Sequence, residues 1–275
     1  MITVRTGVLL MQAAALIYAA AAVAYIVYFA KKRSRAGTAG TGLLVLGILV
    51  HTAALVVRAT AASRPPFMSV YEFILSFTLA LAVVYLVIEI RLGTRMLGAF
   101  HMPLVALFGF AAVRMPSVVN PTMPALRSIL RVPHISAALV SYAAFGSAFV
   151  LAIQYLIRIR ADKTESDFWP DRLPDTDALD HIIYRTIALG FVLLTFAIVT
   201  GAVWAQAAWG KYWSWDNKEV WSAVTWLIYA AYLHTRRSLG WSGRRSALAA
   251  IVGFAAAMFT LFGVTYLLPS IHGYR

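Results

Sequence analysis

The stretch Val8–Ala30 reads VLLMQAAALIYAAAAVAYIVYFA, contains no charged residue and is followed directly by Lys31-Lys32-Arg33. A helix needs about 20 apolar residues to cross the hydrocarbon core of a bilayer, and this stretch exceeds that length. It is also longer than the apolar part of a signal peptide, and basic residues stand where a small-residue cleavage site would be expected. The stretch therefore predicts a retained membrane-spanning helix.

The rest of the chain has the same character. Of its 275 residues, 61% are hydrophobic and 13% are charged, whereas soluble chains carry about 25% charged residues. Only helices and closed barrels satisfy the backbone inside lipid. We therefore expect an all-α fold, a polytopic membrane helical bundle of about eight transmembrane helices that forms a single domain over 1–275. The expected spans are 8–30, 42–62, 72–90, 98–114, 134–157, 185–205, 219–235 and 246–268.

The net charge of +13 does not indicate nucleic-acid binding, because the basic residues fall in short loops between apolar runs. Alternate loops hold fifteen Lys and Arg residues on one side and eight on the other. The richer side is expected to face the cytoplasm. Both termini and the loop between the sixth and seventh spans then face the periplasm or the outside, which fits a multi-pass protein of the bacterial inner membrane.

Six of the eight tryptophans lie in the segment 204–226, which reads WAQAAWGKYWSWDNKEVWSAVTW. An aromatic belt at the lipid–water interface is one explanation, but a belt scatters aromatic residues over many helix ends. The concentration in one outward-facing segment favours a stacking platform for a flat, apolar, partly charged ligand such as haem. Lys211 or Lys218 would then meet a haem propionate, unless each is simply a solvated interfacial charge.

The segment resembles the tryptophan-rich WWD signature of the haem-handling proteins of cytochrome c maturation, through Trp209-Gly210-x-Tyr-Trp213-Ser-Trp215-Asp216-x-Lys218-Glu219-x-Trp221. The Lys-Glu pair after the Asp is most similar to the CcsA/ResC branch, the system II synthase. A second tract, Pro66-x-x-Ser69-x-Tyr71-Glu72, resembles that family's Pro-Leu-x-Asn-x-Tyr-Glu element, with Phe67 in place of Leu and Ser69 in place of Asn. The resemblance implies haem contacts at His134, His272, His234, Trp204, Trp209, Trp213, Trp215, Asp216 and Trp221.

Two histidines are expected at the level of the tryptophan segment. His134 opens the fifth span and His272 follows the eighth, so the topology alone brings them to the same side. Neutral imidazole is a good axial ligand for haem iron, and the resemblance implies that these two histidines are the outer iron ligands. The alternative for each is an interfacial histidine that bonds water or backbone.

The remaining histidines are expected on the inner side or within the bundle. The resemblance implies that His234, at the inner end of the seventh span, belongs to a haem entry site whose second ligand comes from a partner; the alternative is a helix-end histidine. His51 lies mid-span and would need a partner there, which favours a hydrogen bond within the bundle over a second inner ligand. His101 and His181 are given no role.

Arg58 and Glu72 are expected to meet across the short hairpin between the second and third spans. Arg58 lies near the outer end of one span and Glu72 begins the next. A structural ion pair is favoured over contact with a haem propionate.

The resemblance implies the haem-handling subunit of a cytochrome c synthase, a holocytochrome c synthase or haem lyase. Its substrates would be haem b and an apocytochrome c with a Cys-x-x-Cys-His motif, and its partner a CcsB/ResB-type membrane protein. The sequence offers no certain catalytic residue, so the contribution would be positioning and protection of the iron. With no cysteine, the chain excludes disulfides, thiolate metal sites and reduction of the apocytochrome thiols by its own side chains.

Other functions stay open. One is a HemX-like membrane regulator of haem synthesis, and another is a CcmC-like haem exporter or chaperone that forms no thioether. An unrelated transporter is disfavoured, because the paired half-repeats with broken helices of many carriers are absent from the sequence.

Overall fold

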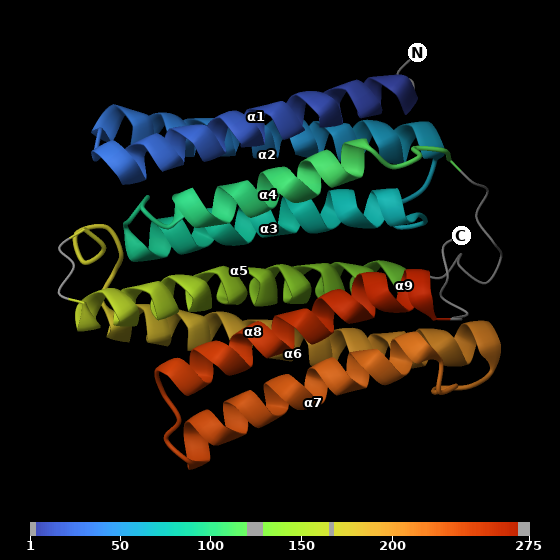
Figure 1. Cartoon of the computed structure of the whole chain (residues 1–275). Coiled ribbons are helices and arrows are strands. Elements are labelled where there is room, and N and C mark those ends of the chain that lie inside the picture. The colour runs from blue at the N-terminus through green and yellow to red at the C-terminus, as the bar shows by residue number, and fades with distance from the viewer. Residues whose placement is uncertain (1–3, 120–128, 165–167, 269–275) are drawn as a thin grey trace. The chain divides into compact units, whose positions relative to one another are not determined.

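The computed structural model describes residues 4–119, 129–164 and 168–268, and every regular element within those ranges is helical. Figure 1 shows and labels the helices. They are α1 (Val4–Lys31), α2 (Ser34–Ala62), α3 (Val70–Leu92), α4 (Gly98–Val113), α5 (Arg131–Lys163), α6 (Thr176–Trp209), α7 (Asn217–Ser238) and α8 (Arg244–Met258), which continues through a π-helical turn, η2 (Phe259–Gly263), into α9 (Val264–Leu267).

Six of these helices are long and apolar enough to cross a membrane: α1, α2, α3, α5, α6 and the continuous helix Arg244–Leu267. The predicted all-α, multi-pass membrane fold is thereby confirmed. The expected span 98–114 corresponds to α4, which is apolar but only 16 residues long. The expected span 219–235 corresponds to α7, which has 22 residues but a buried face of hydroxyl-bearing side chains: Thr225, Tyr229 and Tyr232.

The outward surface of α6 illustrates why these helices suit lipid. Large apolar side chains recur on it every three or four residues and stay exposed. These side chains are Leu189, Val192, Phe196, Val199 and Val203. A stripe of this kind would promote aggregation in water, but it is the expected surface of a helix in hydrocarbon.

The chain divides into two compact units, Met1–Pro121 and Thr122–Arg275. In the first unit, α1 packs on α2 and α4, and α3 packs on the same two helices. Small residues let these helices approach closely; a Cβ atom on Gly47, for example, would lie against the ring of Tyr18. That the two units work as a single domain stays a prediction.

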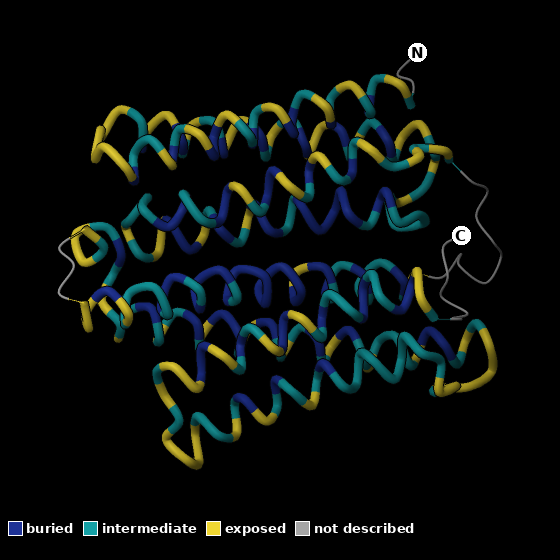
Figure 2. Tube along the Cα trace, viewed as in Figure 1, coloured by how far each residue is buried: buried dark blue, intermediate teal, exposed yellow. Residues whose placement is uncertain are grey.

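In the second unit, α5 packs on α6 and α8, and α7 packs on the same two helices. α5 is buried along most of its length, which Figure 2 shows as a dark run. The N-terminus of α5, the loop between α6 and α7, and the end of the helix that contains η2 lie at one end of this unit (Figure 1). That end carries His134 and the tryptophan segment.

Candidate functional site

His134 lies in the first turn of α5, and its imidazole points to the neighbouring helix α6. Its Nδ1 atom lies 2.7 Å from the carbonyl oxygen of Ala197. A carbonyl oxygen only accepts hydrogen bonds, so Nδ1 carries the proton in this arrangement. A neutral imidazole of this tautomer presents its lone pair at Nε2, which is the form that binds iron, and iron-ligating histidines usually have such a backbone partner.

The surface of α6 is shaped around this imidazole. A Cβ atom on Gly201 would lie 2.7 Å from Cε1 of His134, so only glycine leaves room for the ring. The ring of Trp204 lies 5.9 Å from the imidazole, centroid to centroid, and Trp204 is buried. Ala197, Gly201 and Trp204 follow the three- to four-residue spacing of one helix face. The structure therefore brings together His134 and Trp204, two residues that the sequence predicted for the site.

The loop of the tryptophan segment is shorter than expected, because the flanking helices extend into it. α6 continues to Trp209 and ends at Gly210, whose φ of 73° is the left-handed conformation that glycine adopts most readily. Trp215 is also left-handed, with φ 60°. Its ring lies 6.1 Å from that of Trp213 at nearly a right angle. Trp209 and Trp215 remain exposed, so this loop presents large apolar side chains at its surface.

Asp216 has a local structural role at the start of α7. Its side chain accepts a hydrogen bond from the backbone nitrogen of Lys218 at 3.0 Å. The carboxylate of Glu219 accepts from the backbone nitrogens of Asp216 and Ser214. This reciprocal arrangement is a capping box, which satisfies donors that a helix N-terminus otherwise leaves open. The Asp and Glu of the signature therefore fix where α7 begins.

Lys218 lies in the first turn of α7, between the two residues of the capping box. Burial lowers the pKa of Lys218 to about 8, and the negative charge of Asp216 partly opposes that shift. Its ammonium group thus remains charged at neutral pH but loses its proton in moderately alkaline solution.

Two further tryptophans anchor α7 to its neighbours. The Trp226 indole nitrogen donates a hydrogen bond to Thr195 at 2.8 Å, and its ring lies 5.1 Å from that of Phe191. The Trp221 ring lies 4.3 Å from that of Phe259 in η2. Sequence reasoning missed the partners of these rings, because nothing in the sequence marks a threonine or phenylalanine on a neighbouring helix as a contact.

The other predicted histidines do not join His134. His234 is exposed and lies thirteen positions after Trp221 on α7, which corresponds to about 20 Å of helix. His51 is fully buried, and its Nδ1 lies 3.3 Å from the Tyr18 hydroxyl, which confirms the hydrogen bond expected within the bundle. His272 lies outside the described residues, so its place in the site stays a prediction.

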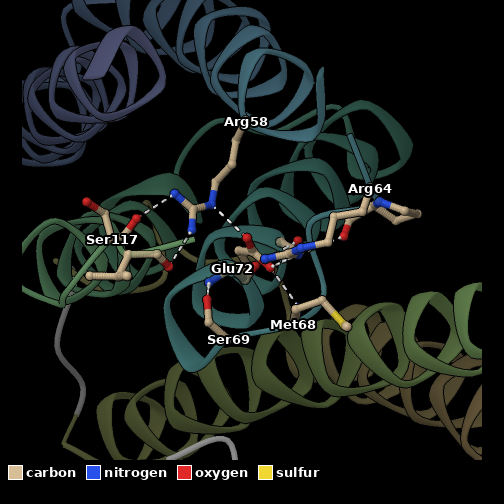
Figure 3. A network of polar contacts seen from close by, with 9 residues as sticks. Arg58, Arg64, Met68, Ser69, Glu72 and Ser117 are labelled. Atoms are coloured by element: carbon tan, nitrogen blue, oxygen red, sulfur yellow. Dashed lines mark hydrogen bonds and ion pairs between the residues drawn. The ribbon is translucent and has the colours of Figure 1, made fainter. Parts of the chain in front are cut away.

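Arg58 and Glu72 form the expected ion pair, with Nε of Arg58 2.8 Å from Oε1 of Glu72 and both side chains buried (Figure 3). Nη1 and Nη2 of Arg58 donate to the carbonyl oxygens of Ser117 and Val118. Arg64 adds a second ion pair to Glu72 at 2.9 Å. Every nitrogen of the Arg58 guanidinium is thus bonded to a group of the protein, so this cluster holds the hairpin and the chain beyond α4 together.

Residues 67–272 match the family described as Cytochrome C assembly protein. The chain belongs to this family. The match covers the Arg58–Glu72 hairpin from Phe67 onward, His134 and the whole tryptophan segment.

Relatives within the family carry a more specific name. The protein named cytochrome c biogenesis protein CcsA of Synechococcus elongatus is 34% identical over 86% of this chain and 86% of its own length. Proteins of the same name from Prochlorococcus marinus and Guillardia theta are 37% and 34% identical over 85% and 86% of this chain, and over 83% and 85% of their own lengths. This family member is therefore a CcsA-type cytochrome c biogenesis protein.

The fold of this family member is also found in a solved structure. The protein titled Cytochrome c Heme Lyase CcmF matches with a TM-score of 0.70 and 17% sequence identity, over 98% of this chain and 47% of that protein. The chain thus corresponds to about half of the larger protein. At this identity the likeness concerns the helical architecture alone.

Proposed function

We propose that this CcsA-type protein is the haem-handling subunit of a cytochrome c synthase, with haem b as its cargo. The observation that carries the proposal is the hydrogen bond from Nδ1 of His134 to the Ala197 carbonyl, beside the buried ring of Trp204. It fixes the imidazole in the tautomer that binds iron through Nε2. His272 supplies the second iron ligand, and the tryptophan segment covers the flat face of the haem.

In this proposal the protein positions the haem and performs no proton transfer of its own. The two imidazoles hold the iron, and the vinyl groups face the apocytochrome. Each thioether bond forms when a Cys S–H of the apocytochrome adds across a vinyl C=C, so carbon gains both sulfur and hydrogen and no electrons are needed. Effective concentration and orientation supply the rate enhancement. The histidine of the Cys-x-x-Cys-His motif then displaces one imidazole of the protein.

In this proposal haem enters at His234, on the side of the membrane opposite the tryptophan segment. It is then transferred to the site at His134. The larger number of Lys and Arg residues on the His234 side supports a cytoplasmic location for that side. Because His234 is exposed on α7, the second ligand of an entry site there comes from another chain. A CcsB/ResB-type membrane protein is the partner that we assign to this role.

The test is the visible absorption spectrum of the purified protein, co-expressed with its partner, beside His134→Ala and the double variant His134→Ala/His272→Ala. We expect sharp reduced α and β bands in the unsubstituted protein and their loss in the double variant. His181→Ala is the matched control, because His181 is exposed and lies outside the site. An equal haem content in all variants would indicate that His234 or His51 supplies the iron ligands instead.

Two other outcomes separate the alternative functions. Protein that never retains haem would favour a HemX-like regulator of haem synthesis. Protein that retains haem but, with its partner, forms no thioether on an added apocytochrome would favour a CcmC-like exporter.

A further inference from the structure

The π-helical turn η2 interrupts the last long helix directly opposite Trp221. The backbone nitrogen of Val264 bonds to the carbonyl oxygen of Phe259, five residues earlier, in place of the four of an α-helix. Such turns insert one extra residue into a helix and occur frequently at functional sites. Here the turn faces Trp221, a residue of the tryptophan signature.

Two consecutive residues of η2 touch Trp221 in different ways. The Phe259 ring packs against the Trp221 indole, with 4.3 Å between ring centroids. The Thr260 hydroxyl lies 3.1 Å from the backbone carbonyl oxygen of Trp221 and 2.9 Å from that of Ala256 in its own helix. Consecutive side chains of an α-helix point about 100° apart. A turn closed over five residues holds more residues than an α-turn, so the two side chains diverge less and both reach the same neighbour.

The polar part of this contact is buried and shared between helices. Thr260 is 1% exposed and Thr225 of α7 is fully buried, with 3.0 Å between their hydroxyl oxygens. Thr225 also donates to the carbonyl of Trp221, at 2.9 Å. Hydrogen bonds between hydroxyl groups join helices where lipid offers no competing partner. The small cluster therefore fixes the position of η2 along the first turns of α7.

Gly263 completes the turn. A Cβ atom at this position would overlap the ring of Phe259. Glycine lets that ring lie back over the helix and still meet the indole of Trp221. The turn, its glycine and both contacts with Trp221 form one local arrangement.

We propose that η2 sets the position of Trp221 at the haem site, and that Thr260 is the positioning residue through which it acts. The inference rests on the proposed function, since it concerns the same haem site. Thr260 does not contact the iron or the reacting vinyl groups in this scheme. It holds the tryptophan platform by fixing α7 against the helix that leads to His272.

The test compares Thr260→Val with Thr265→Val as the matched control. Thr265 is buried in the same helix, and among the residues that the structure describes its hydroxyl donates to the carbonyl oxygen of Leu261, within that helix. Loss of one hydrogen bond corresponds to about a two- to tenfold change in an equilibrium constant, so we expect Thr260→Val to retain haem two- to tenfold less tightly and to shift its reduction potential. Thr260→Ser restores the hydroxyl and should restore both properties, whereas Thr265→Val should leave them unchanged.

A second readout needs no haem. The chain has no cysteine, so spin labels attach only at introduced cysteines. Leu227→Cys and Leu267→Cys place labels on exposed positions of α7 and of α9, the helix that follows the turn. We expect the distance distribution between them to shift or broaden in Thr260→Val and in Gly263→Ala, and to keep its form in Thr265→Val.

The outcomes separate the two proposals. Absence of haem from the unsubstituted protein would overturn the proposed function, while a distance shift confined to Thr260→Val and Gly263→Ala would still support the role of η2 in placing Trp221. An unchanged distance distribution in Thr260→Val would overturn the inference about η2. Equal effects of Thr260→Val and Thr265→Val on both readouts would also overturn it, because they would indicate a general loss of stability.

Discussion

Gly201 and His134 fit together across the interface between α6 and α5, since a Cβ atom at position 201 would lie 2.7 Å from Cε1 and 2.8 Å from Nδ1 of the imidazole. The glycine therefore determines where the ring of His134 lies. It also allows the ring to reach the carbonyl oxygen of Ala197. The position that we propose for His134 as an iron ligand thus depends on Gly201, which has no side chain.

Gly201→Ala should weaken haem binding without unfolding the protein. Alanine is favoured over glycine in a helix by about 1 kcal/mol, which offsets part of the steric cost. Displacement of the ring breaks the hydrogen bond at Nδ1, and loss of such a partner lowers metal affinity about 10- to 100-fold. The measurement is the haem-to-protein ratio together with the melting temperature. Gly42→Ala is the control, because nothing lies within 4 Å of a Cβ atom there; equal haem in both variants would contradict the prediction.

Asp216 provides a test of whether an acidic residue of the signature acts on haem or on the helix. Asparagine caps a helix N-terminus about as well as aspartate, whereas alanine costs about 1 kcal/mol. If capping is the main role, Asp216→Asn should keep the melting temperature and haem content of the parent, and Asp216→Ala should lower both. A loss of haem in Asp216→Asn at unchanged melting temperature would instead show that the carboxylate charge is needed at the site.

The sequence predicted which segments are helices but not where they end. The sixth span was expected over 185–205, whereas α6 runs over Thr176–Trp209. Hydrophobic runs mark the part of a helix that crosses lipid. The helix itself ends where a cap stops it, here at Gly210 and at Asp175, whose side chain accepts from Ala178. Several polar residues near each helix end could act as caps. The sequence alone therefore does not show at which residue the helix ends.

The site was predictable where a side chain carries its own chemistry. His134 and the tryptophans stand out because imidazole and indole are rare inside apolar sequence. Ala197 and Gly201 do not, since a backbone carbonyl and an absent side chain leave no signal in a single sequence. The sequence does not mark Thr260 either, because its role depends on the register between two helices that are far apart along the chain.

Glu72 should prove essential for stability. Its carboxylate is fully buried and accepts hydrogen bonds from Arg58, Arg64 and the backbone nitrogen of Met68. Removal of one partner from a buried ion pair leaves an uncompensated charge, at a cost of about 3–5 kcal/mol. Glu72→Gln should therefore lower the melting temperature in detergent markedly. Asp162→Asn, which breaks the more exposed pair with Arg158, should cost under about 0.5 kcal/mol; similar effects of the two variants would contradict the prediction.

Lys218 should give the protein a distinctive response to alkaline pH. Its pKa is lowered from 10.5 to about 8 by burial. Below pH 8 the lysine is charged in both the folded and the unfolded chain. Between about pH 8 and 10.5 the unfolded chain binds a proton that the folded chain lacks, so the contribution of this group to the free energy of unfolding rises with pH.

The measurement is the melting temperature of the unsubstituted protein and of Lys218→Met at intervals from pH 7 to pH 10. Below pH 8 the methionine variant should be the more stable, because it has no charge to bury, and its advantage should shrink as the pH rises from 8 to 10. Lys211→Met is the control for the loss of a lysine from the same loop, since Lys211 is exposed. A constant offset for Lys218→Met would mean that the ammonium group is as well solvated as that of Lys211, and that this end of α7 is open to water.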